Sequence, residues 1–285
     1  MRKKHRILFA TLVVALLGAI AWVALRRNEP EPIYQGKSLS EWLAIYDPTN
    51  TVRSPEDLQA TQAAIREMGT NAIPVLLRMM RTQDPRWKEW LINLARRQSV
   101  VPVRHVSSAS LHERAALGLT VLGHQADSAI PDLIQIYDQN LSPDSQASVV
   151  RVLALLGPSA RAAVPSLIRG ATNTNEVVRA NVIYALGKIH ADPDLVVPVL
   201  IKSLQDDSPL IRAQAATALG DFGPAAKAAV PALVELRKNP GTNASASPWT
   251  SLYNVNISKS VDDALRKIDP DFRVEFVTNN PASPR

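Results

Sequence analysis

The chain contains no cysteine among its 285 residues, and aromatic residues make up only 5% of it. The absence of cysteine excludes disulfide bonds, metal sites built from thiolates and lipid attachment to an N-terminal cysteine. The sequence also lacks Gly-x-Ser-x-Gly, and its Gly-Lys pairs at 36–37 and 187–188 have no phosphate-binding loop around them. No motif for a serine hydrolase or a nucleotide-binding site is therefore present.

Acidic residues are missing from the first 27 positions. The formal net charge of +6 comes from 32 basic and 26 acidic residues. Six of the basic residues lie within residues 1–27, which leaves 26 basic against 26 acidic residues in the rest of the chain. Because the body of the protein is neutral, we expect no general attraction to nucleic acid. The six basic residues are Arg2, Lys3, Lys4, Arg6, Arg26 and Arg27.

Between these basic groups, residues 7–25 form a run of 19 uncharged and mostly apolar residues. As a helix this run spans about 28 Å, which matches the hydrocarbon core of a membrane. The excess of basic residues before it predicts a single-pass transmembrane helix with a cytoplasmic N-terminus and the rest of the chain outside the cytoplasm. A signal peptide cleaved near Ala21 is the alternative. The uncleaved anchor is favoured, because the apolar run continues past Ala21 to Leu25 and ends at two arginines.

Four prolines recur at an almost constant interval. Pro131, Pro165, Pro198 and Pro231 are 34, 33 and 33 residues apart, and each has a leucine two residues later. A fixed period of this size is typical of solenoids, in which helix pairs stack and each pair buries its apolar face against its neighbours. The period predicts an all-α fold, an α-solenoid of about five helix pairs.

The best-preserved repeat predicts both of its helices. Pro209 opens a first helix, whose apolar residues recur at helical spacing, and Gly223-Pro224 ends it. A second helix starts near Pro231, where proline is tolerated because a first-turn N–H has no partner within the helix.

Two arginines hold equivalent positions in successive repeats. Arg179 and Arg212 are 33 residues apart, each just inside a first helix, and the acidic pair Asp206-Asp207 lies between helices. We predict a structural role for these residues, in which the arginines pair with turn acids or cap carbonyl groups of neighbouring repeats.

The repeats resemble HEAT repeats, in the short HEAT-like form seen in phycobilisome-lyase-type proteins. The resemblance covers about residues 55–270. The segment from Tyr34 to Leu43, the anchor and a tryptophan-containing insertion are similar to those of exported, membrane-anchored bacterial HEAT-repeat proteins, to which no activity attaches. This resemblance implies a bacterial inner-membrane protein with its C-terminal domain outside the cytoplasm, or a periplasmic one if the signal is cleaved.

The predicted organisation has four segments. They are the anchor at 1–27, a linker with an N-terminal capping helix at 28–54, the repeat array at 55–270 with an insertion at about 81–106, and a C-terminal tail at 271–285.

One His-Glu pair, His112-Glu113, raises the question of a metal site. The deoxyhypusine hydroxylases, which are HEAT-repeat enzymes, hold two irons with several such pairs on successive repeats, whereas the pair occurs once here. We therefore interpret His112 as a solvated residue at a helix start, and we expect no metal, no cofactor and no catalytic residue.

The insertion is the predicted specific binding site. Seven basic and two acidic residues lie between positions 78 and 104, and Trp87 and Trp90 are spaced to share one side of a helix. Tryptophan and arginine are favoured anchors of interfaces, so we predict that Trp87, Trp90, Arg96 and Arg97 contact a protein partner. Tryptophans packed under the insertion with a solvated basic rim, or a patch facing anionic lipid, are the alternatives.

The second helices of such arrays are expected to line the concave face, and their exposed positions are further predicted contacts. These positions are Asp132, Gln135, Arg169, Lys202 and Glu235. The sequence thus predicts a non-catalytic scaffold or adaptor that is tethered to the membrane and binds a protein, with no nucleic acid and no small-molecule substrate. A HEAT-like lyase or metal-dependent enzyme subunit and a structural spacer of the cell envelope are the alternatives.

Overall fold

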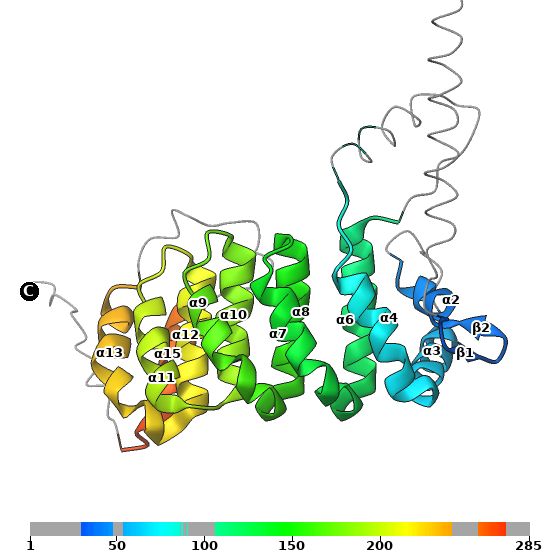
Figure 1. The fold of residues 1–285 in the computed structure, drawn as a ribbon. Coiled ribbons are helices and arrows are strands. Elements are labelled where there is room, and N and C mark those ends of the chain that lie inside the picture. The colour runs from blue at the N-terminus through cyan, green and yellow to red at the C-terminus, as the bar shows by residue number, and fades with distance from the viewer. Residues whose placement is uncertain are drawn as a thin grey trace, which may run out of the picture.

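The chain forms a row of helix pairs, each made of a first helix and a shorter second helix. Figure 1 shows the pairs stacked side by side, from α3 and α4 at one end to α12 and α13 at the other. This arrangement confirms the predicted all-α repeat array. The computed structural model describes residues 30–47, 54–85, 87, 90, 106–240 and 256–271.

Five helix pairs lie within the described residues. The first helices are α3 (Pro55–Met68), α6 (Ser108–Leu122), α8 (Pro143–Leu156), α10 (Glu176–Ile189) and α12 (Pro209–Phe222). The second helices are α4 (Ile73–Met80), α7 (Ile130–Asp138), α9 (Val164–Gly170), α11 (Pro193–Ser203) and α13 (Val230–Lys238). Short 3-10 helices join four pairs: η2 (Gly69–Ala72), η3 (Gly123–Ala129), η4 (Gly157–Ala163) and η5 (Gly223–Ala229). The ends add β1 (Ile33–Tyr34), β2 (Lys37–Ser38), α2 (Leu39–Leu43), η1 (Ala44–Tyr46) and α15 (Ile257–Ile268).

The predicted boundaries of the best-preserved repeat are confirmed. Helix α12 starts at Pro209, and α13 has Pro231 in its first turn. Helix α12 ends at Gly223, whose φ of +54° lies in the region that favours glycine because a Cβ would be strained there. The first helices α3, α6 and α8 end in the same way, with positive φ at Gly69, Gly123 and Gly157.

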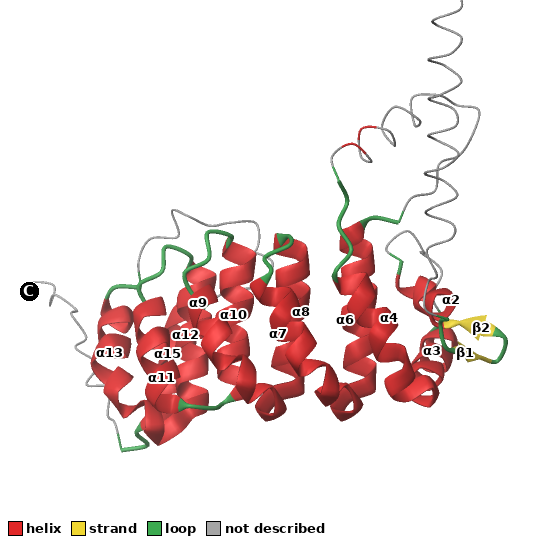
Figure 2. Cartoon of the chain, in the orientation of Figure 1, coloured by secondary structure: helices red, strands yellow, loops and turns green. Residues whose placement is uncertain are grey.

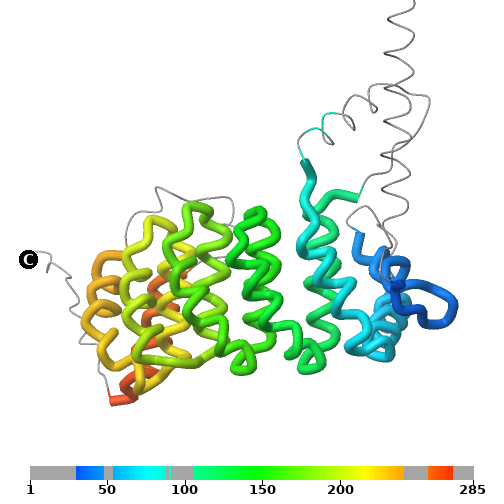
Figure 3. The backbone as a smooth tube through the Cα atoms, in the orientation of Figure 1, coloured from blue at the N-terminus to red at the C-terminus, as the bar shows by residue number. Residues whose placement is uncertain are grey.

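The first helices pack against one another more extensively than the second helices do. Small residues allow this close approach: a Cβ added at Gly187 of α10 would lie 2.7 Å from the Cβ of Ala218 in α12. A Cβ added at Gly220 of α12 would lie 2.8 Å from the Cα of Ala264 in α15. Figure 3 shows the regular path that the backbone follows through the stack. One apolar core runs the length of the array.

A β-hairpin and α2 lie at the N-terminal end of the array, where Figure 2 shows the strands beside α3. Strands β1 and β2 pair antiparallel, with Tyr34 opposite Lys37, through a turn in which Gly36 has a φ of +76°. Helix α2 follows directly, buries Leu39 and Leu43 completely, and contacts α3 and α6. The helix is the capping helix predicted from the sequence, whereas the hairpin was not predicted.

Helix α15 stands at the other end of the array as half a repeat. It packs against α12 and α13, and Arg237 Nε of α13 donates a hydrogen bond to Asp262 Oδ1 of α15 at 2.7 Å. Its solvent-facing surface carries exposed charged residues, including Lys259 and Arg266. A polar outer face on the last helix keeps the end of a repeat array soluble. The buried residues of α15 are Ile257, Val261, Ala264, Leu265 and Ile268.

The predicted transmembrane segment at 7–25, with the possible cleavage point at Ala21, lies outside the described residues. Within the described part, one helical stretch, Pro143–Gly170, is long and apolar enough to cross a membrane. It consists of α8, η4 and α9, and most of its apolar window is buried inside the array. Its apolar character is therefore accounted for by the core of the array.

Candidate partner-binding surfaces

Trp87 and Trp90 carry two of the most exposed large apolar side chains in the described part of the chain. Both residues are helical, and they are 64% and 63% exposed. They therefore stand free of the packed array, as an interface anchor requires. The other two residues predicted for this site, Arg96 and Arg97, lie outside the described residues.

Two predicted contact residues on the second helices form ion pairs between neighbouring repeats. Arg81, at the end of α4, donates to Asp132 Oδ1 of α7 at 2.7 Å. Arg169 Nη2 of α9 donates to Asp138 Oδ1 of α7 at 3.0 Å. Such exposed pairs contribute only about 0–1 kcal/mol each, so these side chains remain available for a partner at little cost.

The other three predicted second-helix positions, Gln135, Lys202 and Glu235, are exposed. Glu235 accepts a hydrogen bond from Asn239 Nδ2 at 2.7 Å. Lys202 borders a hollow of about 670 Å³ near the ends of α9 and α11. The five second-helix positions thus lie on the surface, and their contact with a partner stays a prediction.

A hollow that the sequence analysis did not predict lies over the first helices. It has a volume of about 630 Å³ and is lined by α8, α10, α12 and the start of α15. Leu155 and Tyr184, which line it, are 55% and 42% exposed. A second hollow of about 510 Å³, between α12 and α15, shares Thr217 and Ser260 with the first. We call the two connected hollows the first-helix groove.

Two lysines share one carboxylate in the first-helix groove. Lys267 Nζ lies 2.9 Å from Asp221 Oδ1, and Lys188 Nζ lies 3.4 Å from Asp221 Oδ2. Burial opposes ionisation of Asp221, but the hydrogen bond from Lys267 and the charges of both lysines outweigh burial and hold the pKa of Asp221 below its ordinary value. The carboxylate is therefore charged at neutral pH and balances one of the two lysine charges.

The interpretation of His112 as a solvated residue is wrong. His112 is 1% exposed, and its Nε2 lies 2.8 Å from the carbonyl oxygen of Thr82, because the chain after α4 packs against the start of α6. Glu113 accepts a hydrogen bond from Arg151 of α8 instead, so the two residues of the pair have different neighbours. The described residues contain no group of three or more His, Cys, Asp or Glu side chains placed to hold a metal ion.

The structural role predicted for the two repeat arginines is confirmed. Arg179 donates from Nε and Nη2 to the carboxylate of Asp206 at 2.9 and 3.2 Å. Arg212 donates to the backbone carbonyls of Asp206, Asp207 and Pro240 at 2.7, 3.0 and 3.1 Å. Burial lowers the pKa of Arg212, and the charges of Asp206 and Asp207 oppose that shift. Asp206 thus links two successive repeats, through its side chain on one side and its backbone on the other.

Residues 130–196 and 190–246 match the family model of HEAT repeats. The chain is also similar to an engineered protein of known crystal structure, with 18% sequence identity, a TM-score of 0.40 and coverage of 81% of this chain and 96% of that chain. A search of the curated proteins finds no match. The part of the array that runs from α7 to α13 is therefore built of HEAT repeats.

Proposed function

We propose that this protein is a non-catalytic scaffold that binds a protein partner on its helical array and is tethered to a membrane by its N-terminal segment. The observation that carries the proposal is the exposure of Trp87 and Trp90, at 64% and 63%. Large apolar side chains that stay exposed together on a folded protein mark interaction sites. HEAT repeats, which the array contains, commonly form protein-binding surfaces.

Stacked repeats suit this role for a physical reason. Each repeat contacts its neighbours, so the array offers an extended surface whose shape is set before a partner arrives. Binding then costs little conformational entropy on the scaffold side, which favours recognition. The basic residues near the two tryptophans in the sequence would add electrostatic attraction to an acidic partner.

The tryptophans are expected to be required for partner capture. Full-length protein is crosslinked in cells, purified from membranes and analysed by mass spectrometry, beside Trp87→Ala/Trp90→Ala. We expect one partner to be recovered with the wild type and to fall about tenfold with the variant. Leu195→Ala is the matched control, because Leu195 is an exposed apolar side chain, at 56%, on α11. Equal recovery of the partner with the wild type and with the double variant would show that the tryptophans are not part of the binding site. If no partner is enriched with either protein, the proposed scaffold function is wrong.

The N-terminal segment is expected to hold the chain in the membrane. Full-length protein should remain in the membrane pellet after alkaline carbonate extraction, and a chain lacking residues 1–27 should appear in the soluble fraction. The apolar run at 7–25 is the physical reason, since its transfer into hydrocarbon is strongly favourable. Intact-mass measurement of the extracted protein distinguishes the uncleaved anchor from a chain shortened near Ala21.

Two other functions predict different results. A HEAT-like lyase or metal-dependent enzyme subunit would need convergent polar groups in a pocket, and stoichiometric iron or zinc in the purified full-length protein would favour the metal-dependent form. A structural spacer would tolerate loss of both tryptophans without any change in its recovered partners.

A further inference from the structure

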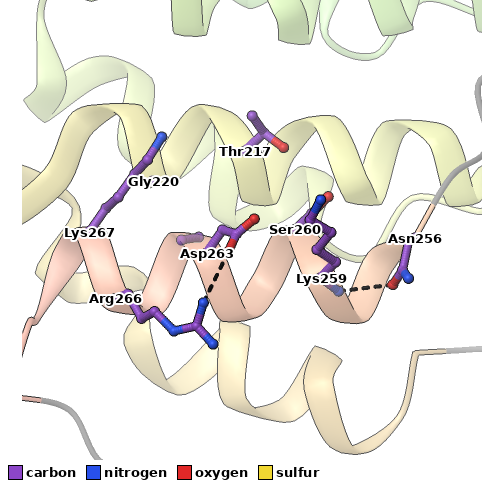
Figure 4. A pocket seen from close by; sticks show the side chains of 9 residues that line it. Thr217, Gly220, Asn256, Lys259, Ser260, Asp263, Arg266 and Lys267 are labelled. Atoms are coloured by element: carbon purple, nitrogen blue, oxygen red, sulfur yellow. Dashed lines mark hydrogen bonds and ion pairs between the residues drawn. The ribbon is translucent and has the colours of Figure 1, made fainter.

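The first-helix groove combines exposed apolar side chains with a floor of small residues. Helix α12 lies between α10 and α15 and presents Ala213 and Thr217 to the groove, while Leu155 and Tyr184 come from α8 and α10. Figure 4 shows Thr217 on α12 and Ser260 on the facing side of α15. A hollow of about 630 Å³ has room for several side chains of a bound peptide.

The groove carries more positive than negative charge. Asp263 is matched by Arg266, with Nη1 and Oδ1 3.3 Å apart, and Asp221 is shared by two lysines. On the second-helix surface, by contrast, Asp132 and Asp138 each have one arginine partner. The surplus in the groove favours a negatively charged ligand. One lining arginine, Arg151, is paired with Glu113 outside the lining, and the surplus remains positive without it. The lining contains five basic and two acidic residues: Arg151, Lys188, Lys259, Arg266, Lys267, Asp221 and Asp263.

The Gln214 side chain adds an unused hydrogen-bonding group to the lining. Its Oε1 is buried and has no hydrogen-bond partner within the described residues. A buried acceptor without a partner is unfavourable, so a donor that reaches it gains stability. Because Oε1 is inaccessible, the partly exposed Gln214 side chain must first turn toward the groove, where a backbone N–H of a bound peptide is such a donor.

From these three features we infer that the first-helix groove binds an acidic peptide segment of a partner protein. Apolar side chains of the peptide pack on Leu155 and Tyr184, and its carboxylates contact Lys188 and Lys267. The inference rests on the proposed function, in which the array binds a protein, and adds the face of the array and the chemistry of the ligand.

The test uses the full-length chain in mild detergent and a random dodecapeptide library displayed on phage. Enriched peptides are expected to combine aspartate or glutamate with leucine or an aromatic residue. The consensus peptide is then labelled, and its Kd is measured by fluorescence anisotropy. Thr217→Trp fills the groove from an exposed position and should weaken binding about tenfold. Thr120→Trp makes the same change at an exposed threonine of α6, outside the groove, and should leave the Kd unchanged. Gln135→Trp tests the second-helix surface separately.

A second variant should increase the affinity for the peptide, which a loss of folding cannot do. Asp221→Asn removes the carboxylate that occupies Lys188 and Lys267, so the peptide should bind about fivefold more tightly. Asp192→Asn, which removes a carboxylate of similar exposure from its ion pair with Arg161 outside the groove, should have no effect.

Several outcomes would overturn the inference. Enriched peptides without acidic residues would contradict the ligand chemistry, and loss of binding with Gln135→Trp alone would move the site to the second-helix surface while leaving the proposed function intact. Tighter peptide binding after deletion of residues 272–285 would identify the chain's own tail as the occupant. A dimer that Thr217→Trp dissociates would identify a second copy. If no peptide is enriched, the inference is wrong, and the co-purification decides the proposed function independently.

Discussion

Arg212→Leu is expected to lower the free energy of unfolding by about 4 kcal/mol. Arg212 is 7% exposed and donates to three backbone carbonyls, those of Asp206, Asp207 and Pro240. Leucine fills a similar volume but leaves these acceptors without a donor, and each hydrogen bond to a charged group contributes about 1.5–3 kcal/mol. Thermal unfolding of the full-length protein, followed by circular dichroism, should show a Tm lower by about 10 °C.

Two further variants separate the hydrogen bonds from the charge. Arg212→Lys keeps the charge but loses the planar fork of donors, so an intermediate loss of stability is expected. Arg266→Leu removes an arginine that is largely exposed and pairs with Asp263, and it should change stability by less than about 0.5 kcal/mol. If Arg212→Leu were as stable as the wild type, the three carbonyls would be hydrated, and the arginine would not join the repeats.

The features that the sequence predicts well are those that depend on neighbouring residues. Pro209 and Gly223 mark the two ends of α12, because a proline in the first turn and a glycine after the last turn act through local backbone geometry. The hydrogen-bond partners of Arg179 and Arg212 could also be predicted, because these partners lie in loops that recur with the same period as the arginines. The array of helix pairs follows from these local signals and from the spacing of the prolines.

The features that the sequence analysis missed depend on distances between helices. The first-helix groove brings together Leu155, Tyr184 and Ser260 from three different repeats, and its depth depends on how closely glycine and alanine let the helices approach. Buried His112 lies beside the carbonyl oxygen of Thr82, which is 30 residues away at the start of the insertion. Neither distance is encoded in a local pattern.

The hairpin was missed for a different reason. Its strands have two residues each, which is too short for an alternating apolar pattern. A local sign of a hairpin was present in the turn between the strands. Gln35 and Gly36 both have positive φ there, and glycine is common in such turns.

Gly170→Ala is expected to lower the free energy of unfolding by about 2 kcal/mol, although alanine favours helices. A Cβ at Gly170 would lie 1.7 Å from the hydroxyl oxygen of Tyr137 and 3.1 Å from Val182 Cγ2. Tyr137 is 4% exposed, and burial raises its pKa to about 12, so the ring is neutral and enclosed. Overpacking of this kind costs about 1–3 kcal/mol. The higher helix propensity of alanine offsets less than about 1 kcal/mol of this cost, because Gly170 is the last residue of α9.

A double-mutant cycle assigns this loss to the tyrosine hydroxyl. Tyr137→Phe removes the oxygen at 1.7 Å and leaves the ring carbon Cζ at 3.0 Å, so Gly170→Ala/Tyr137→Phe should regain most of the stability. The coupling energy measured from the four proteins should be about 2 kcal/mol. Tyr184→Phe is the matched control, because it removes a hydroxyl from a tyrosine that is 42% exposed and should not rescue Gly170→Ala. A coupling energy near zero would show that the strain comes from the contact with Val182, on the facing first helix α10. All of α9 would then shift to relieve it, and not only the part beside Tyr137.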